Sequence, residues 1–96
     1  MFHYIEFPDQ AQMEAIIRVH FGDLDQKLVD QTLAAFYWLR SLRGIEKKPS
    51  TSELVDWLRA LIASGVDAKR LEKEIPFAGV LLKKDKDLKT LQRTRR

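Results

Sequence analysis

The 96-residue sequence contains no cysteine, and its four glycines are isolated from one another. Without cysteine the chain can form no disulfide bond and no cysteine-ligated metal site, as is usual for a protein of a reducing compartment. Isolated glycines cannot make a GxxxxGK[ST] phosphate-binding loop, and no GxSxG, HExxH or EF-hand motif is present. The sequence therefore carries no sign of a catalytic site, and we expect no catalysis by this chain alone.

Long apolar runs are also missing. No stretch of about 18 apolar residues occurs, so the sequence predicts no transmembrane helix. The N-terminus lacks a basic segment followed by an apolar one, since the acidic residues Glu6 and Asp9 come early, and this argues against a secretion signal. We therefore predict a cytoplasmic protein. Its hydrophobic content of 45% over 96 residues is enough for one small packed domain.

Histidine is scarce, and the two histidines, His3 and His20, do not have the spacing of metal ligands. His20 falls on the apolar face of a predicted helix. A single histidine in such a place is more often a packed, hydrogen-bonded core residue than a ligand. The residues alone leave both interpretations open.

One segment near the N-terminus favours an extended conformation. Residues 2–7, FHYIEF, are apolar and aromatic in alternation and end at Pro8, which is typical of a strand. No second strand is predicted, and a single strand cannot satisfy its own backbone hydrogen bonds. The segment is therefore either an irregular arm that packs on helices or part of a sheet formed by other polypeptide.

The rest of the chain is predicted to be helical, because capping residues precede apolar patterns of helical period. The strongest start signal is Ser50, which forms a capping box with Glu53 directly after Pro49 and should contribute about 1 kcal/mol. Asp9 forms a similar box with Gln12. Five helices are predicted: from after Asp9 to near Gly22, from after Asp23 or Asp25 to near Ser41, from after Ser50 to near Gly65, from after Asp67 to near Glu74, and from about Lys84 to near Gln92. A turn or short helix is predicted over 75–82.

The apolar positions of these helices predict a shared core. The second helix is apolar over a wide arc and should be central. Trp38 and Trp57 are predicted to be core anchors rather than ligand contacts. The predicted fold is all-α, a small bundle of four to five helices with a short N-terminal extended arm. The apolar face of the first helix is predicted to consist of Met13, Ile16, Ile17, His20 and Phe21.

Positive charge is concentrated at the C-terminus of the chain. Residues 83–96, KKDKDLKTLQRTRR, contain mostly lysine and arginine, with two aspartates among them. Such a run usually forms a solvated helix face and chain end. The alternative is a surface for an anionic partner such as nucleic acid, but no aromatic residue interleaves the charges. The sequence favours the solvated face and argues against nucleic acid as a partner.

Two stretches resemble a known family. The segment FHYIEFPDQAQMEAIIRVHF resembles the passage by which AAA+ ATPases leave their last core strand and begin the helical lid. The segment KKPSTSELVDWLRALIASGVD, followed by IPFAGVLLKKDKDL, is similar to the lid of the MoxR branch of that family. The resemblance covers nearly the whole chain. It implies that residues 1–8 are the end of the last core strand and the hinge, and that residues 9–96 are the lid domain.

The resemblance also implies a nucleotide site, because AAA+ proteins hold the nucleotide between core and lid. Ile16 and His20 match lid positions that flank adenine. Thr51 and Ser52 match the first turn of a lid helix that faces the nucleotide, and a helix N-terminus suits an anion. Many relatives have a sensor arginine where this chain has Ser52, so contacts to adenine or ribose are implied here instead. The nearest arginine of that helix, Arg59, lies two turns further and is predicted to be too far away.

The ligand implied by the resemblance is ATP, with Mg²⁺ supplied by a separate core, and the expected partners are that core and the neighbouring subunits of a ring, a hexamer. MoxR-type ATPases act as chaperone-like factors in the maturation of other proteins, together with proteins that contain a von Willebrand factor A domain. A lid would transmit rigid-body rotation through the hinge near Pro8. The alternative is a stand-alone helical binding module, either for nucleic acid through the basic C-terminus or for another protein.

Overall fold

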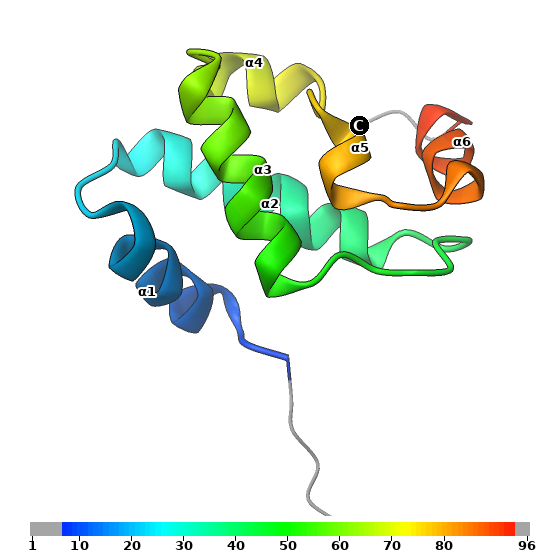
Figure 1. Ribbon diagram of the computed structural model, residues 1–96, viewed down its shortest axis with the longest axis horizontal. Coiled ribbons are helices and arrows are strands. Elements are labelled where there is room, and N and C mark those ends of the chain that lie inside the picture. Colours follow the sequence, from blue (N-terminus) through cyan, green and yellow to red (C-terminus); the bar gives the residue numbers. More distant parts are fainter. Residues whose placement is uncertain (1–6, 94–96) are drawn as a thin grey trace, which may run out of the picture.

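The computed structural model describes residues 7–93, and residues 1–6 and 94–96 lie outside this description. The described part contains six helices (Figure 1). They agree with the predicted boundaries to within about two residues. The helices are α1 (Gln10–Phe21), α2 (Gln26–Ser41), α3 (Thr51–Ala63), α4 (Ala68–Lys73), α5 (Ala78–Leu81) and α6 (Asp85–Arg93).

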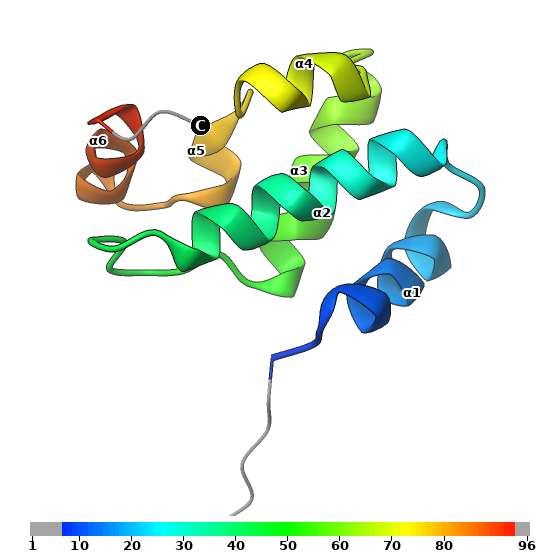
Figure 2. The same ribbon diagram turned by 180° about the vertical axis from the view of Figure 1, so that it is seen from behind.

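The two longest helices, α2 and α3, cross in the middle of the molecule, and the other helices lie around this crossing (Figures 1 and 2). α4 packs against α2, α5 packs against α3, and α1 contacts both central helices. Trp57 and Phe36 are the largest fully buried side chains of the core between them. The other buried apolar residues of this core cluster are Met13, Ile17, Val29, Leu33, Ala35, Leu39, Ile45, Leu54, Leu58, Leu61, Val66, Leu71, Leu81 and Leu82.

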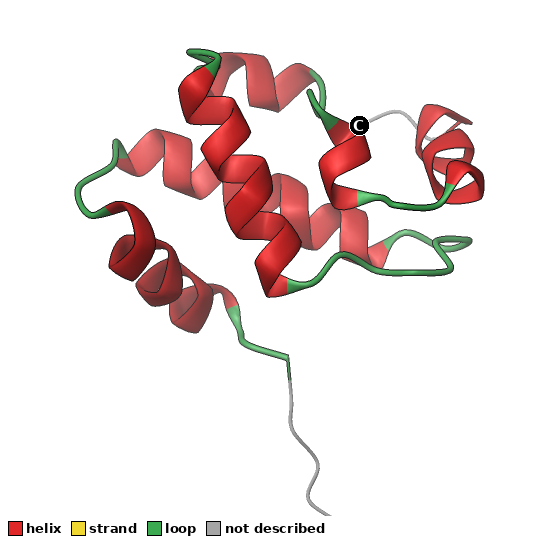
Figure 3. Ribbon diagram, viewed as in Figure 1, coloured by secondary structure: helices red, strands yellow, loops and turns green. Residues whose placement is uncertain are grey.

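The prediction of an all-α bundle is confirmed, and residues 7–93 contain no strand (Figure 3). Six helices are present rather than four to five, because the segment 75–82 forms the separate four-residue helix α5. Most of the predicted strand, residues 2–7, lies outside the described residues, and Phe7 belongs to no regular element. Both tryptophans pack as predicted: Trp57 is fully buried and Trp38 packs half-buried against the core.

Local hydrogen bonds explain where the helices begin. At α1 the amide of Gln12 donates to Asp9 Oδ1 at 2.8 Å, and the amide of Asp9 donates to Gln12 Oε1 at 2.9 Å. At α4 the amide of Arg70 donates to Asp67 Oδ1 at 2.9 Å. These bonds satisfy N–H groups that have no carbonyl partner within the helix, so the predicted starts after Asp9 and Asp67 are confirmed.

The three prolines of the chain share one structural feature, which is a side-chain hydrogen bond to the proline carbonyl. The hydroxyl of Tyr37 donates to the carbonyl of Pro8 at 2.6 Å. Trp57 Nε1 donates to the buried carbonyl of Pro76 at 2.6 Å. The guanidinium of Arg40 donates to the carbonyl of Pro49. Each bond fixes a segment that leads into a helix to a side chain of α2 or α3.

The C-terminal helix α6 is attached through a polar contact of Asp87 as well as through Leu88 and Leu91, which pack half-buried against the core. Asp87 is fully buried, and its two carboxylate oxygens accept hydrogen bonds from the amides of Glu46 and Lys47 at 2.7 and 3.0 Å. These two hydrogen bonds hold the pKa of the Asp87 carboxyl below its ordinary value. Asp87 thus holds the loop between α2 and α3 against α6. The interpretation of residues 83–96 as a solvated run did not predict this contact.

Candidate functional site

A hollow lies between the C-terminal end of α1 and the N-terminal half of α3, and we call it the α1–α3 hollow. Its volume is about 210 Å³. Sites that enclose a small molecule usually have about 300–1,000 Å³. The hollow is therefore large enough for part of a nucleotide, and a second surface would have to cover the rest. It is lined by His20, Thr51, Ser52, Val55, Asp56 and Arg59.

The start of α3 brings hydrogen-bond donors to this hollow. The amide of Ser50 donates to Glu53 Oε1 at 2.9 Å, and the Ser50 hydroxyl donates to the same oxygen at 3.1 Å, so the predicted capping box is formed. Thr51 and Ser52 are the first two residues of α3. The N–H groups of a first helical turn have no carbonyl partner within the helix and carry partial positive charge.

Two opposite charges complete the lining. Arg59 Nη1 and Asp56 Oδ1 are 3.8 Å apart, and both side chains are more than half exposed. Exposed pairs of this kind contribute little to stability, so neither side chain is firmly held by the other. The guanidinium of Arg59 also lies 5.9 Å from the centre of the Phe21 ring. The lining thus combines hydroxyl groups, an apolar surface from Val55 and one exposed cation. Together these groups can contact a ligand that has both polar and aromatic parts.

Three of the four residues predicted to bind nucleotide meet at this hollow, namely His20, Thr51 and Ser52. Ile16 does not line the hollow, and it packs half-buried against the core. The interpretation of His20 as a packed core residue is wrong, because the side chain is exposed. Its position on the apolar face is as predicted, but that face reaches the hollow at the last turn of α1, where the His20 side chain is exposed.

Sequence reasoning missed Arg59, which lines the same hollow as Ser52. Arg59 lies seven residues after Ser52, which is almost two full helical turns, so both side chains lie on one face of α3. Long side chains of a helix also point toward its N-terminus, which brings Arg59 closer to the first turn. Val55 and Asp56 lie three and four residues after Ser52, and these helical spacings also indicate them as its neighbours on the same face.

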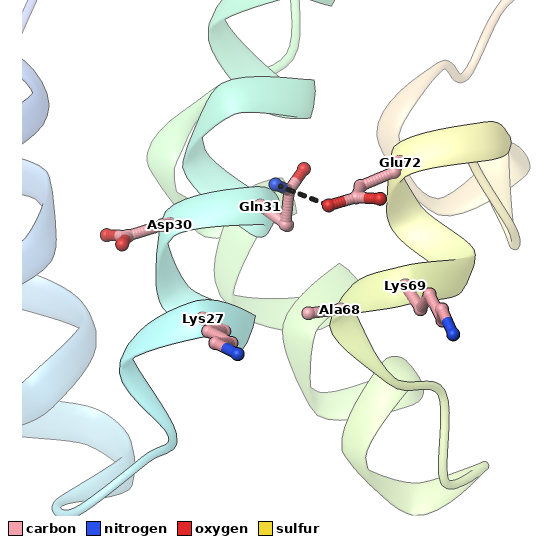
Figure 4. Close-up of a pocket in the computed structure, with 6 residues that line it drawn as sticks. All are labelled: Lys27, Asp30, Gln31, Ala68, Lys69 and Glu72. Carbon is pink, nitrogen blue, oxygen red and sulfur yellow. Dashed lines mark hydrogen bonds between the residues drawn. The ribbon is translucent and has the colours of Figure 1, made fainter.

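A second hollow, of about 600 Å³, lies between α2 and α4 (Figure 4). Gln31 Nε2 donates to Glu72 Oε1 at 3.4 Å across it, while Asp30 points away from α4 in this view. None of the predicted site residues lines it, and its two lysines are balanced by two acidic residues. We therefore regard the smaller α1–α3 hollow as the candidate site. The larger hollow is lined by Lys27, Asp30, Gln31, Ala68, Lys69 and Glu72.

The basic C-terminal run is partly neutralised within the fold. Lys84 Nζ lies 2.8 Å from Glu46 Oε1, and Lys86 Nζ lies 3.5 Å from Glu46 Oε2. The pKa of the Lys84 amine is raised by its hydrogen bond to Glu46. Asp87 adds a buried negative charge near these lysines. The described part of the run is therefore a docked helix that carries both charges, rather than a continuous basic surface.

Comparisons with models of protein families, with curated proteins and with solved structures found no match to this chain. Within residues 7–93, none of the helices has the length and apolar character needed to cross a membrane. The same residues contain no group of three or more histidine and acidic side chains that could hold a metal ion. The functional interpretation therefore depends on the geometry of the α1–α3 hollow and on the resemblance in sequence.

Proposed function

We propose that this chain is the helical lid of a MoxR-type AAA+ ATPase and that it covers a nucleotide held by a separate core. The observation that carries the proposal is the meeting of His20, Thr51 and Ser52 at one hollow. His20 lies about 30 positions before Thr51 and Ser52 in the sequence, and the resemblance implies all three as nucleotide contacts. Their convergence supports a shared ligand.

The lining of the hollow fits one side of a nucleotide. Val55 and the exposed His20 ring offer surface for a base, and the hydroxyls of Thr51 and Ser52 suit ribose or phosphate oxygens. Arg59 adds a cation for a phosphate oxygen. ATP bound with Mg²⁺ would supply the energy of the ATPase cycle, and the acidic ligands of the metal would belong to the core.

In this proposal the chain contributes binding and motion rather than chemistry. The lid would close over the nucleotide, and its movement about the hinge at Pro8 would reach the neighbouring subunits of a ring, a hexamer. The ring would act in the cytoplasm on other proteins in a chaperone-like manner, with a von Willebrand factor A domain protein as partner. This assignment of partners follows from the sequence resemblance alone.

The proposal can be tested by titrating the ¹⁵N-labelled 96-residue chain with MgATP and following its amide resonances. Because half a site lacks the phosphate contacts of the core, we expect a dissociation constant on the order of 1 mM or weaker. The largest shift changes should occur at His20, Thr51 and Ser52. AMP should compete with ATP, whereas inorganic triphosphate should compete less, since base and ribose contacts are expected to dominate.

Two matched variants make this titration decisive. Ser52→Ala should weaken the shifts at the α1–α3 hollow, and Gln31→Ala, which alters the other hollow, should leave them unchanged. Shifts confined to the α2–α4 hollow, or none at about 10 mM ATP, would count against the lid assignment. The coding sequence upstream of Met1 gives an independent test, because an open frame that contains a GxxxxGK[ST] motif is expected there.

A further inference from the structure

Arg40 on α2 contacts two segments that are distant from each other in the sequence. Its guanidinium lies over the Phe7 ring, 3.5 Å from the ring centre. The same guanidinium donates a hydrogen bond to the carbonyl of Pro49. Burial lowers the pKa of Arg40, although the group stays charged at any physiological pH because arginine pKa values are so high.

The segment Phe7–Pro8, which we call the connector, is held on the second half of α2. The Phe7 ring stacks on Phe36 with 6.0 Å between ring centres, and it meets Tyr37 edge to face at 6.3 Å. The hydroxyl of Tyr37 donates to the carbonyl of Pro8 at 2.6 Å. Ring contacts and a hydrogen bond therefore fix the connector before α1 begins.

The other contact of Arg40 fixes the start of α3. Pro49 is buried, and it directly precedes Ser50, the cap of that helix. Thr51 and Ser52 follow at once and line the α1–α3 hollow. A shift of the Pro49 carbonyl would therefore displace the first turn of α3 and the donors that it presents to the hollow.

Only a guanidinium suits both contacts. Its flat face stacks on an aromatic ring, while its N–H groups lie in the plane and donate at the edge. A lysine ammonium has no flat face, so it cannot stack on Phe7 and donate to Pro49 in one geometry. The two contacts are therefore made by one rigid group, so a movement of that group changes both.

We propose that Arg40 is a positioning residue that couples the connector to the first turn of α3, so that a displacement of Phe7 is transmitted to Thr51 and Ser52. This coupling is a property of the chain without any ligand, and it goes beyond the proposed function. If the lid assignment is correct, the coupling joins the hinge to the nucleotide site. If it is wrong, the coupling still joins the connector to the α1–α3 hollow.

A double-mutant cycle on the 96-residue chain tests the coupling without nucleotide. The variants are Phe7→Leu, Arg40→Met and the double variant, and Arg40→Met keeps the apolar stem while removing the guanidinium. The main readout is hydrogen exchange of the Leu54 amide, which donates to the carbonyl of Ser50 at 3.0 Å in the first turn of α3. The resonance positions of Thr51 and Ser52 give a second readout.

We expect Phe7→Leu to speed exchange of the Leu54 amide roughly three- to tenfold when Arg40 is present, as loss of one or two weak contacts would do. In the Arg40→Met background the same substitution should change the rate by less than about twofold. Arg40→Lys should behave like Arg40→Met, because charge alone does not restore both contacts. An equal effect of Phe7→Leu in both backgrounds would overturn the proposal.

Leu28→Ala serves as the matched control for a general loss of stability. Leu28 packs half-buried against the core on the first half of α2, about 18 Å along the helix from Arg40. It should lower global stability without changing the resonances of Thr51 and Ser52. If Leu28→Ala instead reproduces the local changes seen with Phe7→Leu, those changes report global opening and the coupling is refuted. Because no nucleotide is present, neither result depends on the outcome of the ATP titration.

Discussion

The crossing of α2 and α3 and the docking of α6 are two regions of one small fold that are stabilised in different ways. At the crossing, Trp57, Phe36 and their neighbours are fully buried apolar side chains. At α6, the carboxylate of Asp87 accepts hydrogen bonds from two amides of the α2–α3 loop, and Lys84 forms an ion pair with Glu46 nearby. Apolar burial depends little on pH, whereas a buried carboxylate stabilises only while it is ionised. We therefore expect that the stability of the core and the attachment of α6 can be changed separately.

The largest expected effect is at the crossing. Trp57→Ala removes the largest buried side chain and leaves the carbonyl of Pro76 without its donor, so it should lower the free energy of unfolding by about 3–5 kcal/mol. Trp38→Ala, at the half-buried tryptophan of α2, should cost clearly less. Urea denaturation followed by circular dichroism measures both, and equal losses would show that burial does not distinguish the two sites.

A smaller effect, confined to α6, is expected from Asp87→Ala. The amides of Glu46 and Lys47 then lose their acceptor, and α6 should detach while the core remains folded. Hydrogen exchange of these two amides should become fast, and proteolysis should cleave within 82–93 first. Glu46→Gln is the control, since it removes the lysine pairs but keeps the Asp87 hydrogen bonds; detachment of α6 in this variant would show that the surface pairs matter more.

Acid should reproduce the Asp87 substitution. The folded-state pKa of Asp87 lies below its unfolded value of about 3.9, because the amides of Glu46 and Lys47 stabilise the ionised form. The unfolded state therefore binds more protons at acidic pH, and stability falls as pH falls. The contribution of Asp87 should be complete above about pH 4 and be lost as pH drops through the lower folded value. Urea midpoints between pH 7 and pH 2 should show a shallower acid slope in Asp87→Ala, and identical slopes would contradict the assignment.

The smallest expected effect is a gain of stability at the crossing. Thr32 on α2 is fully buried, and its hydroxyl has no hydrogen-bond partner among residues 7–93. Thr32→Val keeps the shape of the side chain and removes the unpaired group, so it should raise the free energy of unfolding by about 1 kcal/mol. Urea denaturation gives this difference, and Thr90→Val on α6 is the matched surface substitution. A loss of stability in Thr32→Val would show that the hydroxyl has a partner, such as a buried water molecule.

The helices could be predicted because their signals are local. Asp9 with Gln12 and Ser50 with Glu53 lie three residues apart, so each pair can be recognised without knowledge of the fold. The structural role of Asp87 could not be predicted in this way, because the two amides that donate hydrogen bonds to its carboxylate are 40 and 41 residues away. In sequence it is one more charge in a run of charges. Only the placement of the α2–α3 loop turns it into a buried residue.

The candidate site was predictable to the extent that family resemblance placed its residues on α1 and α3. His20, Thr51 and Ser52 line one hollow, whereas helical period alone placed His20 on the apolar face of α1 and left open whether it packs in the core. Period gives the direction in which a side chain points, and it does not tell whether another element covers that position. Ile16 and His20 share a face of α1, yet only Ile16 packs against the core.

The three proline carbonyls have a consequence for the order in which the chain folds. Their donors lie 29, 9 and 19 residues away in sequence, on α2 or α3. The segments around Pro8, Pro49 and Pro76 therefore cannot complete their hydrogen bonds from neighbouring residues, as an ordinary tight turn does. We therefore expect these segments to become ordered after the central helices form, so that closure of these corners follows the nucleation of α2 and α3.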